Sequence, residues 1–259
     1  METLIKQKLK EIERQKGVKI LYACESGSRA WGFPSPDSDY DVRFIYTHDL
    51  DWNLSIRKRR DTIDLPVNDL LDIGGWEIGK ALGLLWKSNA PLLEWIQSPI
   101  VYYADDAFIN RFRQLSPYYF SPIAVMHHYQ SMAKKYFEMC SEQSEVKLKK
   151  YFYALRAAMA GKWIREKRSM PPIQLPTMLE LTDKELCKKI HELIDVKSCQ
   201  SEGYTHAFEP SINDFLTETI QENDLIANQL PSAKGDFDLL DEFYREVVKH
   251  AGMEEQYQV

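Results

Sequence analysis

Cysteine, glycine and proline are scarce in this chain, and each shortage excludes a class of protein. The 259 residues include 4 cysteines, 11 glycines and 12 prolines. The cysteines lie far apart, without a CxxC pair or a histidine at ligand spacing, so we expect neither a disulfide framework nor a zinc site. So few glycines and prolines argue against the many turns of a β-sandwich. We therefore expect a helix-rich protein from a reducing compartment.

Long apolar runs and an excess of positive charge are also missing. No apolar stretch approaches the ~18 residues that span a membrane, and the amino terminus is charged throughout, unlike a signal peptide. Lysine and arginine total 33 against 39 aspartates and glutamates, a net charge of −6. The overall charge therefore does not favour nucleic acid or an anionic membrane, although a local basic groove is compatible with it. We expect a cytoplasmic protein with no membrane partner.

Strand-like segments are concentrated in the first part of the chain. Strands are expected over residues 19–24 and 40–47, with weaker signals at 61–67 and 68–76. Helices are expected near residues 2–15, 77–87, 91–97, 105–114, 120–139, 144–167, 183–195, 210–228 and 237–250. The prediction is an α+β protein: a small mixed-sheet domain over residues 1–115, followed by a helical bundle over 116–259.

The segment between the first two predicted strands carries the candidate chemistry. Gly27 and Ser28 follow the first strand, and Asp39 and Asp41 begin the second. Alternate residues of a strand share a face, roughly 6 to 7 Å apart, so the two carboxylates can together bind magnesium ions. Gly27 lets backbone approach a phosphate, and Ser28 can donate to its oxygens. Either feature alone is common on solvated loops, but the two in this order indicate a nucleotide site.

The stretch GSRAWGFPSPDSDYDVRF resembles the signature of the DNA polymerase beta-like nucleotidyltransferase superfamily. More narrowly, ACESGSRAWGF, DSDYDVRFIY, DIGGWEIGKAL, KSNAPLLEWIQSPIVY and KKYFYALR resemble bacterial and phage predicted nucleotidyltransferases associated with RNA repair operons. The likeness covers roughly residues 17–165. It implies transfer of a nucleoside monophosphate from a nucleoside triphosphate, with Mg²⁺ or Mn²⁺ as cofactor and release of pyrophosphate. The implied acceptor is an RNA end, with a protein side chain or a small molecule as alternatives.

The resemblance also implies roles for individual residues. Gly27 and Ser28 would hold the triphosphate, and Arg29 is a further candidate for a phosphate contact. Asp39 and Asp41 would bind both metals. A third carboxylate on a neighbouring strand would act with one metal on the attacking hydroxyl, and the sequence offers Asp64 and Asp72 for it.

We prefer Asp72 for the third carboxylate. Asp64 precedes Leu65–Pro66, and proline biases the chain before it toward an edge-like conformation. Asp72 follows the apolar pair Leu70–Leu71 and precedes Gly74–Gly75, so we expect the strand to finish there beside a flexible turn. A carboxylate at a strand end can reach a metal without becoming a buried, unpaired charge.

The predicted helix over residues 144–167 adds Lys149, Tyr153 and Arg156, which follow i, i+4, i+7 spacing. Cations there can reach a triphosphate, and Tyr153 can stack on a base, in a helical domain that binds nucleotide or acceptor. The alternative is that this stripe is an ordinary solvated face. Trp31 is expected to pack the short helix after Gly27 onto the sheet.

Two other classes of function stay open. The first is a non-catalytic antitoxin-like or scaffold protein that keeps the fold, which the intact glycine, serine and paired aspartates argue against. The second is an RNA-binding module that uses the basic run at residues 57–60. The net charge of −6 and the lack of aromatics interleaved with that run argue against it, so a solvated loop is the default interpretation.

Overall fold

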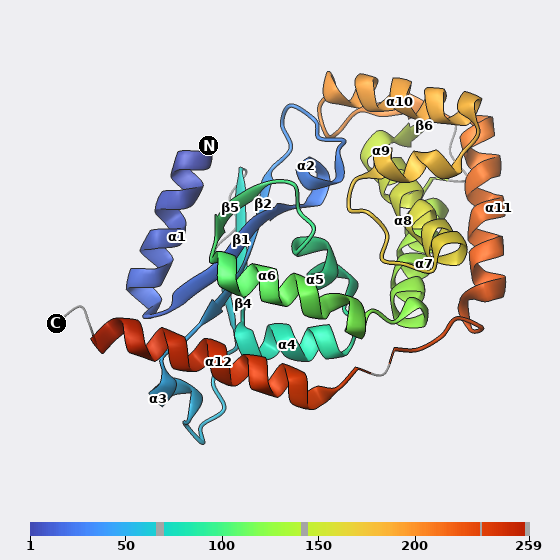
Figure 1. Cartoon of the computed structure of the whole chain (residues 1–259). Helices are drawn as coiled ribbons and strands as arrows, with labels where there is room; N and C mark the ends of the chain where they lie inside the picture. The colour runs from blue at the N-terminus through green and yellow to red at the C-terminus, as the bar shows by residue number, and fades with distance from the viewer. Residues whose placement is uncertain (66–69, 141–144, 234, 257–259) are drawn as a thin grey trace. The chain divides into compact units, whose positions relative to one another are not determined.

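The computed structural model describes residues 1–65, 70–140, 145–233 and 235–256 (Figure 1). The α+β class is confirmed by a mixed sheet followed by a mostly helical region. No helix in these residues is long and apolar enough to cross a membrane. Contacts divide the chain into two compact units: a sheet unit of residues 1–26, 39–119 and 234–259, and a helical unit of residues 27–38 and 120–233.

The sheet unit is built on five strands in the order β3-β4-β2-β1-β5. β2 pairs antiparallel with β1 and parallel with β4, so a carboxylate on β2 has a neighbour on each side. β1 is buried along its six central residues, as a near-continuous apolar run predicts for a strand covered on both faces. The strands are β1 (Lys19–Ser26), β2 (Tyr40–Thr47), β3 (Thr62–Asp64), β4 (Leu71–Glu77) and β5 (Val101–Ala104).

β4 runs through both of its glycines, so the expectation that the strand ends at Asp72 is wrong. Asp72 is the second residue of β4, and Gly74 and Gly75 lie inside the strand. A Cβ added to Gly75 would lie 2.3 Å from the ring of Phe44 on β2. Glycine is needed there because the aromatic ring packs across the strand, and no turn is involved.

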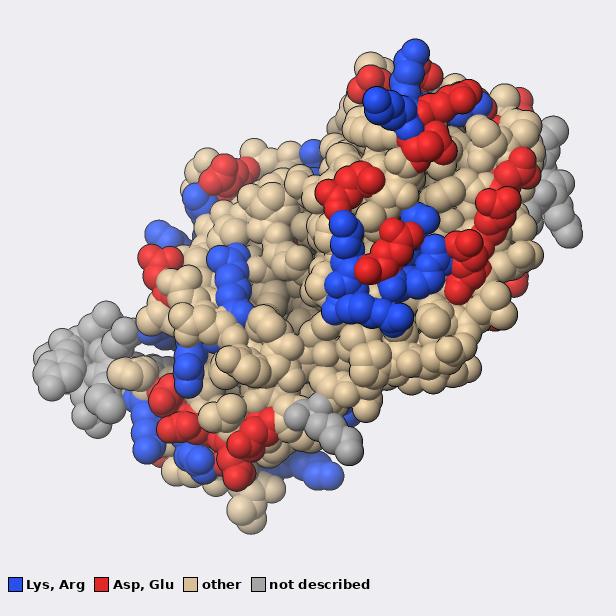
Figure 2. Space-filling view, turned by 45° about the vertical axis from the view of Figure 1, so that its right-hand side comes forward, with Lys and Arg blue, Asp and Glu red and all other residues tan. Residues whose placement is uncertain are grey.

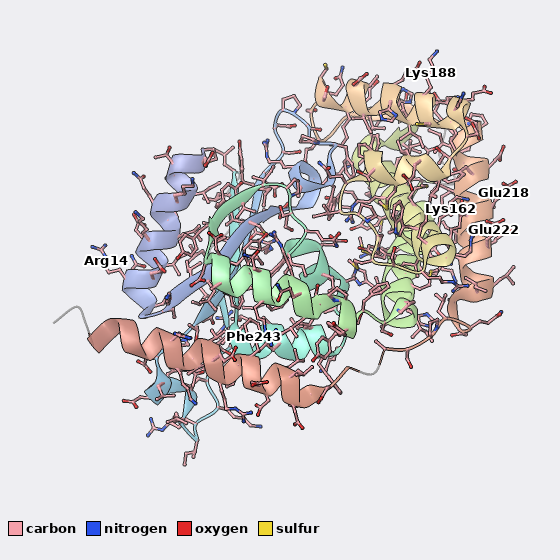
Figure 3. All side chains as sticks on the ribbon, in the orientation of Figure 1. Arg14, Lys162, Lys188, Glu218, Glu222 and Phe243 are labelled. Atoms are coloured by element: carbon pink, nitrogen blue, oxygen red, sulfur yellow. The ribbon has the colours of Figure 1, made fainter. Side chains whose placement is uncertain are left out.

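Helices cover the sheet, and the last one comes from the far end of the chain. α1 inserts Ile5, Leu9 and Ile12 into the core of the sheet unit. Phe243 of α12, which is labelled in Figure 3, stacks on Phe108 of α6, with ring centroids 5.6 Å apart. The helices of this unit are α1 (Glu2–Lys16), α3 (Leu50–Asn53), α4 (Ile78–Trp86), α5 (Ala90–Trp95), α6 (Asp106–Leu115), the 3₁₀ turn η1 (Ser116–Tyr119) and α12 (Phe237–Gln256).

The helical unit packs around α8, which is buried without interruption from Ala154 to Gly161. α7 and α11 pack against α8, and the Asn223 amide of α11 donates to the Ala158 carbonyl at 3.1 Å. The elements of this unit are α2 (Gly27–Trp31), α7 (Pro122–Glu138), β6 (Glu145–Lys147), α8 (Leu148–Lys167), α9 (Leu175–Met178), η2 (Leu179–Leu181), α10 (Lys184–Ser198), β7 (Thr205–Ala207) and α11 (Pro210–Ala227).

The two units do not follow the predicted division of the chain at residues 115/116. Residues 27–38 group with the helical unit, and the segment from 234 onward groups with the sheet unit. Trp31, which we expected to pack α2 onto the sheet, instead lies edge-on to Tyr153 of α8, with ring centroids 5.2 Å apart. A loop between two strands carries no local signal for the helices that it will contact.

Candidate functional site

Two of the predicted carboxylates lie side by side in the sheet unit. Asp41 on β2 and Asp72 on β4 are partners in the parallel register. The Arg43 Nη2 atom lies 2.6 Å from an Asp72 carboxylate oxygen and 3.3 Å from one of Asp41. The three side chains are 22–28% exposed. The two acids therefore share one cation and remain within reach of solvent.

This shared cation shows that the pair can accept a positive ion between its oxygens. Carboxylate oxygens are also the ligands that Mg²⁺ prefers, so Asp41 and Asp72 fit a divalent metal chemically. Asp39 precedes β2 and is half-buried. Within the residues that the structure describes, no three His, Cys, Asp or Glu side chains are grouped so as to hold a metal. The fold thus brings together two of the three predicted metal ligands and does not group Asp39 with them.

The alternative third carboxylate, Asp64, has different surroundings. It lies on β3 opposite Gly74. Its side chain is 59% exposed and pairs with Arg60 at 2.6 Å. Pro66, on which part of the preference against Asp64 rests, lies outside the described residues. Register therefore brings Asp72 next to Asp41, while Asp64 pairs with a cation of its own.

A buried glutamate that the sequence analysis missed anchors the start of β2. Glu25 on β1 is fully buried. One of its carboxylate oxygens accepts a hydrogen bond from the Asp41 backbone N–H at 2.7 Å, and the Tyr102 hydroxyl of β5 donates to the other. These bonds hold the backbone of Asp41 to the neighbouring strand. The sequence signal for Glu25 was an acidic residue at the end of an apolar strand. Arg43 was also missed, and its sequence signal was a basic residue two positions after Asp41.

The loop after β1 forms a separate polar cluster in the helical unit. Gly27 has a φ of 68°, a left-handed conformation that favours glycine at the turn into α2. The Ser28 hydroxyl donates to Ser38 Oγ at 3.2 Å, and the Arg29 guanidinium donates to the Ser38 carbonyl at 2.6 Å. The Ser35 backbone N–H also donates to Ser38 Oγ, at 3.0 Å. The loop therefore closes on itself around Ser38.

Two lysines and one glutamate complete this cluster, which we call the serine–lysine cluster. Lys197 of α10 is 2% exposed, and its ammonium donates to the Ser35 hydroxyl at 2.8 Å. Burial lowers the pKa of Lys197 below its ordinary value. Lys149 lies 2.6 Å from one oxygen of Glu202, and Ser38 donates to the other at 2.9 Å. Hydroxyl and ammonium donors thus converge on one carboxylate, an array that also suits a phosphate.

The stripe of α8 that begins with Lys149 is not a solvated face. Tyr153 is half-buried and packs against Trp31 and Tyr136. Arg156 is 2% exposed, donates to the Ile173 carbonyl at 3.0 Å and holds its guanidinium 4.4 Å from the Trp31 ring. Of the three predicted residues, Lys149 joins the serine–lysine cluster, while Tyr153 and Arg156 support Trp31.

Comparison with known proteins relates the chain to a sequence family, to a curated protein and to a solved structure. The sequence model of RlaP, described as the RNA repair pathway DNA polymerase beta family, matches residues 1–246. The chain is 42% identical over 238 residues to the uncharacterized protein YcgL of Bacillus subtilis (strain 168), covering 91% of this chain and 92% of that protein. The crystal structure of a nucleotidyltransferase-like protein from Exiguobacterium sibiricum 255-15 aligns with 87% of this chain and 75% of that one, at 11% identity and a TM-score of 0.31.

Proposed function

The chain belongs to the RlaP family of RNA repair pathway DNA polymerase beta proteins, and on that premise we propose that it is a nucleotidyltransferase. It would transfer a nucleoside monophosphate from a nucleoside triphosphate to an acceptor hydroxyl and release pyrophosphate. The observation that supports this most is the pairing of Asp41 and Asp72 on adjacent parallel strands around one cation. Adjacent carboxylates of this kind suit a reaction in which the main task is to neutralise phosphate charge.

Asp39, Asp41 and Asp72 are the proposed metal ligands, with Mg²⁺ or Mn²⁺ as the metal. When bound, the metal would neutralise charge on the phosphates and lower the pKa of the attacking hydroxyl. Arg43 balances the charge of Asp41 and Asp72, so a metal must compete with its guanidinium for their oxygens. Glu25 fixes the backbone of Asp41 and so limits the positions that its carboxylate can take.

The serine–lysine cluster is the proposed triphosphate-binding part. Gly27, Ser28, Arg29 and Lys149 keep the roles predicted from the sequence, and Lys197 is added to them. The Glu202 carboxylate marks the position of an anion, because it accepts the hydrogen bonds of Ser38 and Lys149 that a phosphate oxygen would accept.

Tyr153 and Arg156 of α8 both contact Trp31, but their proposed roles differ. Tyr153 is half-buried and remains the candidate for stacking on the base. Arg156 is buried against Trp31, so we assign it the positioning of α2 and its serine, within the predicted set of nucleotide-binding residues.

The proposed acceptor is an RNA end, in keeping with the description of the family. The test is incubation of the chain with each α-³²P-labelled nucleoside triphosphate and Mg²⁺ or Mn²⁺. RNA oligonucleotides of defined ends, total RNA, total protein and a small-molecule extract serve as separate acceptor pools. We expect divalent-dependent transfer of label to the RNA pools.

Each other outcome has a defined meaning. Transfer of label to protein or to a small molecule would overturn RNA as the acceptor, but it would support the proposal that the chain is a nucleotidyltransferase. Tight binding of a triphosphate with no transfer to any pool would overturn the catalytic proposal and favour a non-catalytic partner that retains the fold.

A further inference from the structure

A pocket lined by charged and aromatic side chains lies in the sheet unit, away from the residues assigned above. It has a volume of about 300 Å³. It forms where the end of α1, the segment after β2 and the strand β3 come together, and Asp41 and Asp72 are not part of its lining. Six of its lining residues carry the argument: Lys16, His48, Trp52, Arg59, Arg60 and Asp64.

The pocket contains a stacked aromatic pair. The rings of His48 and Trp52 lie 4.0 Å apart between centroids and 9° from parallel. The Asp49 carboxylate holds Trp52 in place by accepting its backbone N–H at 2.6 Å. Burial lowers the pKa of His48, which favours the neutral ring at pH 7. The pair therefore offers a flat, half-buried surface of the kind on which nucleic acid bases stack.

Cations surround this surface. Arg59 holds its guanidinium carbon 5.5 Å from the centre of the Trp52 ring. Lys16, Arg59 and Arg60 line the pocket against one carboxylate, Asp64, which Arg60 already pairs. Over the described part of the chain, Lys16 and Arg59 form no ion pair with a carboxylate. Their positive charge is available to a ligand even though the molecule as a whole is acidic.

The fold places an aromatic ring beside the basic run, which has none within its own sequence. No aromatic residue is interleaved with residues 57–60, but Trp52 lies against Arg59 in space. A base that stacks on the indole can displace the guanidinium from it, and the freed cation can then pair with a phosphate. The aromatic surface and the cations Lys16 and Arg59 form a combination that suits a flexible polyanion with exposed bases.

We propose that this pocket binds single-stranded RNA, with Trp52 stacking on an unpaired base and Arg59 and Lys16 contacting the flanking phosphates. The choice of RNA over DNA rests on the function proposed above. Leu54 and Ile56, which are 71% and 102% exposed, directly precede the basic run, so an anionic membrane surface is the competing ligand that the test must include.

The test is fluorescence anisotropy with an unstructured RNA of about 12 nucleotides, without triphosphate or divalent metal. Trp52→Ala should weaken binding by about tenfold or more, and Trp52→Phe, which keeps a stacking ring, should recover most of the affinity. Arg59→Ala should weaken binding and reduce the salt dependence by about 0.7 in the log–log slope. Thermal melting shows whether each variant is folded.

Matched controls lie elsewhere on the chain. Trp163 is also half-buried with a cation over its ring, because Lys167 lies 5.7 Å from its centre, so Trp163→Ala removes a comparable group from the helical unit. Arg245→Ala removes an exposed guanidinium that pairs with Asp241. Neither should change RNA affinity. Equal losses of RNA affinity in Trp52→Ala and Trp163→Ala would overturn the proposed site. Stronger binding to phosphatidylserine vesicles or to duplex DNA than to RNA would overturn it as well.

The failure of this inference can be told from the failure of the proposed function. Wild-type protein that binds no RNA but transfers label to another acceptor would overturn the pocket alone. If RNA binding depends on Trp52 but the protein transfers no label, the proposed nucleotidyltransferase activity alone would be overturned. Trp52→Ala should also keep its affinity for triphosphate, measured by calorimetry.

Discussion

The sheet unit and the helical unit gather charge in opposite ways. In the sheet unit two carboxylates, Asp41 and Asp72, share the Arg43 guanidinium. In the helical unit donors from Ser38 and Lys149 converge on the Glu202 carboxylate. The first arrangement suits exchange of its cation for a metal, and the second suits exchange of its anion for a phosphate. The two units therefore present groups of opposite charge to a ligand: paired carboxylates in the sheet unit, and hydroxyl and ammonium donors in the helical unit.

The difference between the two units is one of local side-chain arrangement. Basic and acidic side chains are interspersed on the face shown in Figure 2. Both units also bury an ionisable group, of opposite type. Burial raises the pKa of Glu77 in the sheet unit to about 7 and lowers the pKa of Lys197 in the helical unit. In each case a low-dielectric environment favours the neutral form.

The largest expected effect comes from breaking the carboxylate pair. Asp41→Asn removes one charge where a metal would bind, so label transfer should fall by about 1,000-fold while the circular dichroism spectrum is retained. Asp61→Asn is the matched control, because Asp61 is a 51% exposed carboxylate of the same unit and pairs with Lys80. Its transfer should equal that of the wild type, and equal losses in the two variants would contradict the assignment.

The buried acid of the sheet unit predicts a dependence of stability on pH. The folded-state pKa of Glu77 is about 7, above its ordinary value of 4.5, so the folded state binds this proton more tightly than the unfolded state. The stabilisation is fully present below pH 4.5 and is lost as the pH rises to 7. It corresponds to about 3 kcal/mol of unfolding free energy.

Glu77→Gln isolates this contribution. The free energy of unfolding is measured by guanidinium denaturation at pH 4.5 and pH 8. Relative to the wild type, the variant should be about 3 kcal/mol more stable at pH 8 than it is at pH 4.5. The same substitution at Glu11, whose 44% exposed side chain pairs with Lys8, should produce no such gain at the higher pH. A difference between Glu77→Gln and wild type that is the same at both pH values would contradict the raised pKa.

Packing across β4 can be tested separately from its charge. Gly75→Ala places a Cβ 2.3 Å from the Phe44 ring, so the free energy of unfolding should fall by about 1–3 kcal/mol. A Cβ added to Gly83 of α4 would meet no atom within 4 Å, and Gly83→Ala should instead stabilise the protein by about 0.5–1 kcal/mol. Urea denaturation of both variants measures the two effects, and a loss at Gly83 as large as at Gly75 would contradict this account.

The smallest expected effect sharpens the role of the helical unit. Lys197→Met removes a buried ammonium, so triphosphate affinity should fall by about tenfold. The melting temperature should hold or rise, because the cost of burying the ammonium is removed. Lys188→Met, on the outward side of the same helix and 79% exposed, should alter neither quantity (Figure 3). Unchanged affinity in Lys197→Met, by calorimetry, would exclude Lys197 from the triphosphate site.

Periodic patterns located most elements within a few residues. The predicted helices at 120–139, 144–167 and 210–228 correspond to α7, α8 and α11. Recurring apolar residues at helical spacing report which face is buried, and this property is local to the segment. The pattern failed at β4, where two consecutive glycines suggested a turn. Their true cause, the ring of Phe44, lies on another strand.

The amino-acid sequence alone was enough to predict the candidate site residues. They are Gly27 and Ser28 in one loop, Asp39 and Asp41 beside it, and Asp64 or Asp72 as the third carboxylate. Metal and phosphate binding need particular residue types at short spacing, and motifs of this kind can be recognised in the sequence. The partners of these residues, in contrast, follow from the three-dimensional fold.

Strand register brought Asp72 to Asp41, with Arg43 bound to both. Helix packing brought Lys197 to Ser35, 162 residues away. Contacts over such separations depend on the free energy of the whole fold, so no local pattern specifies them.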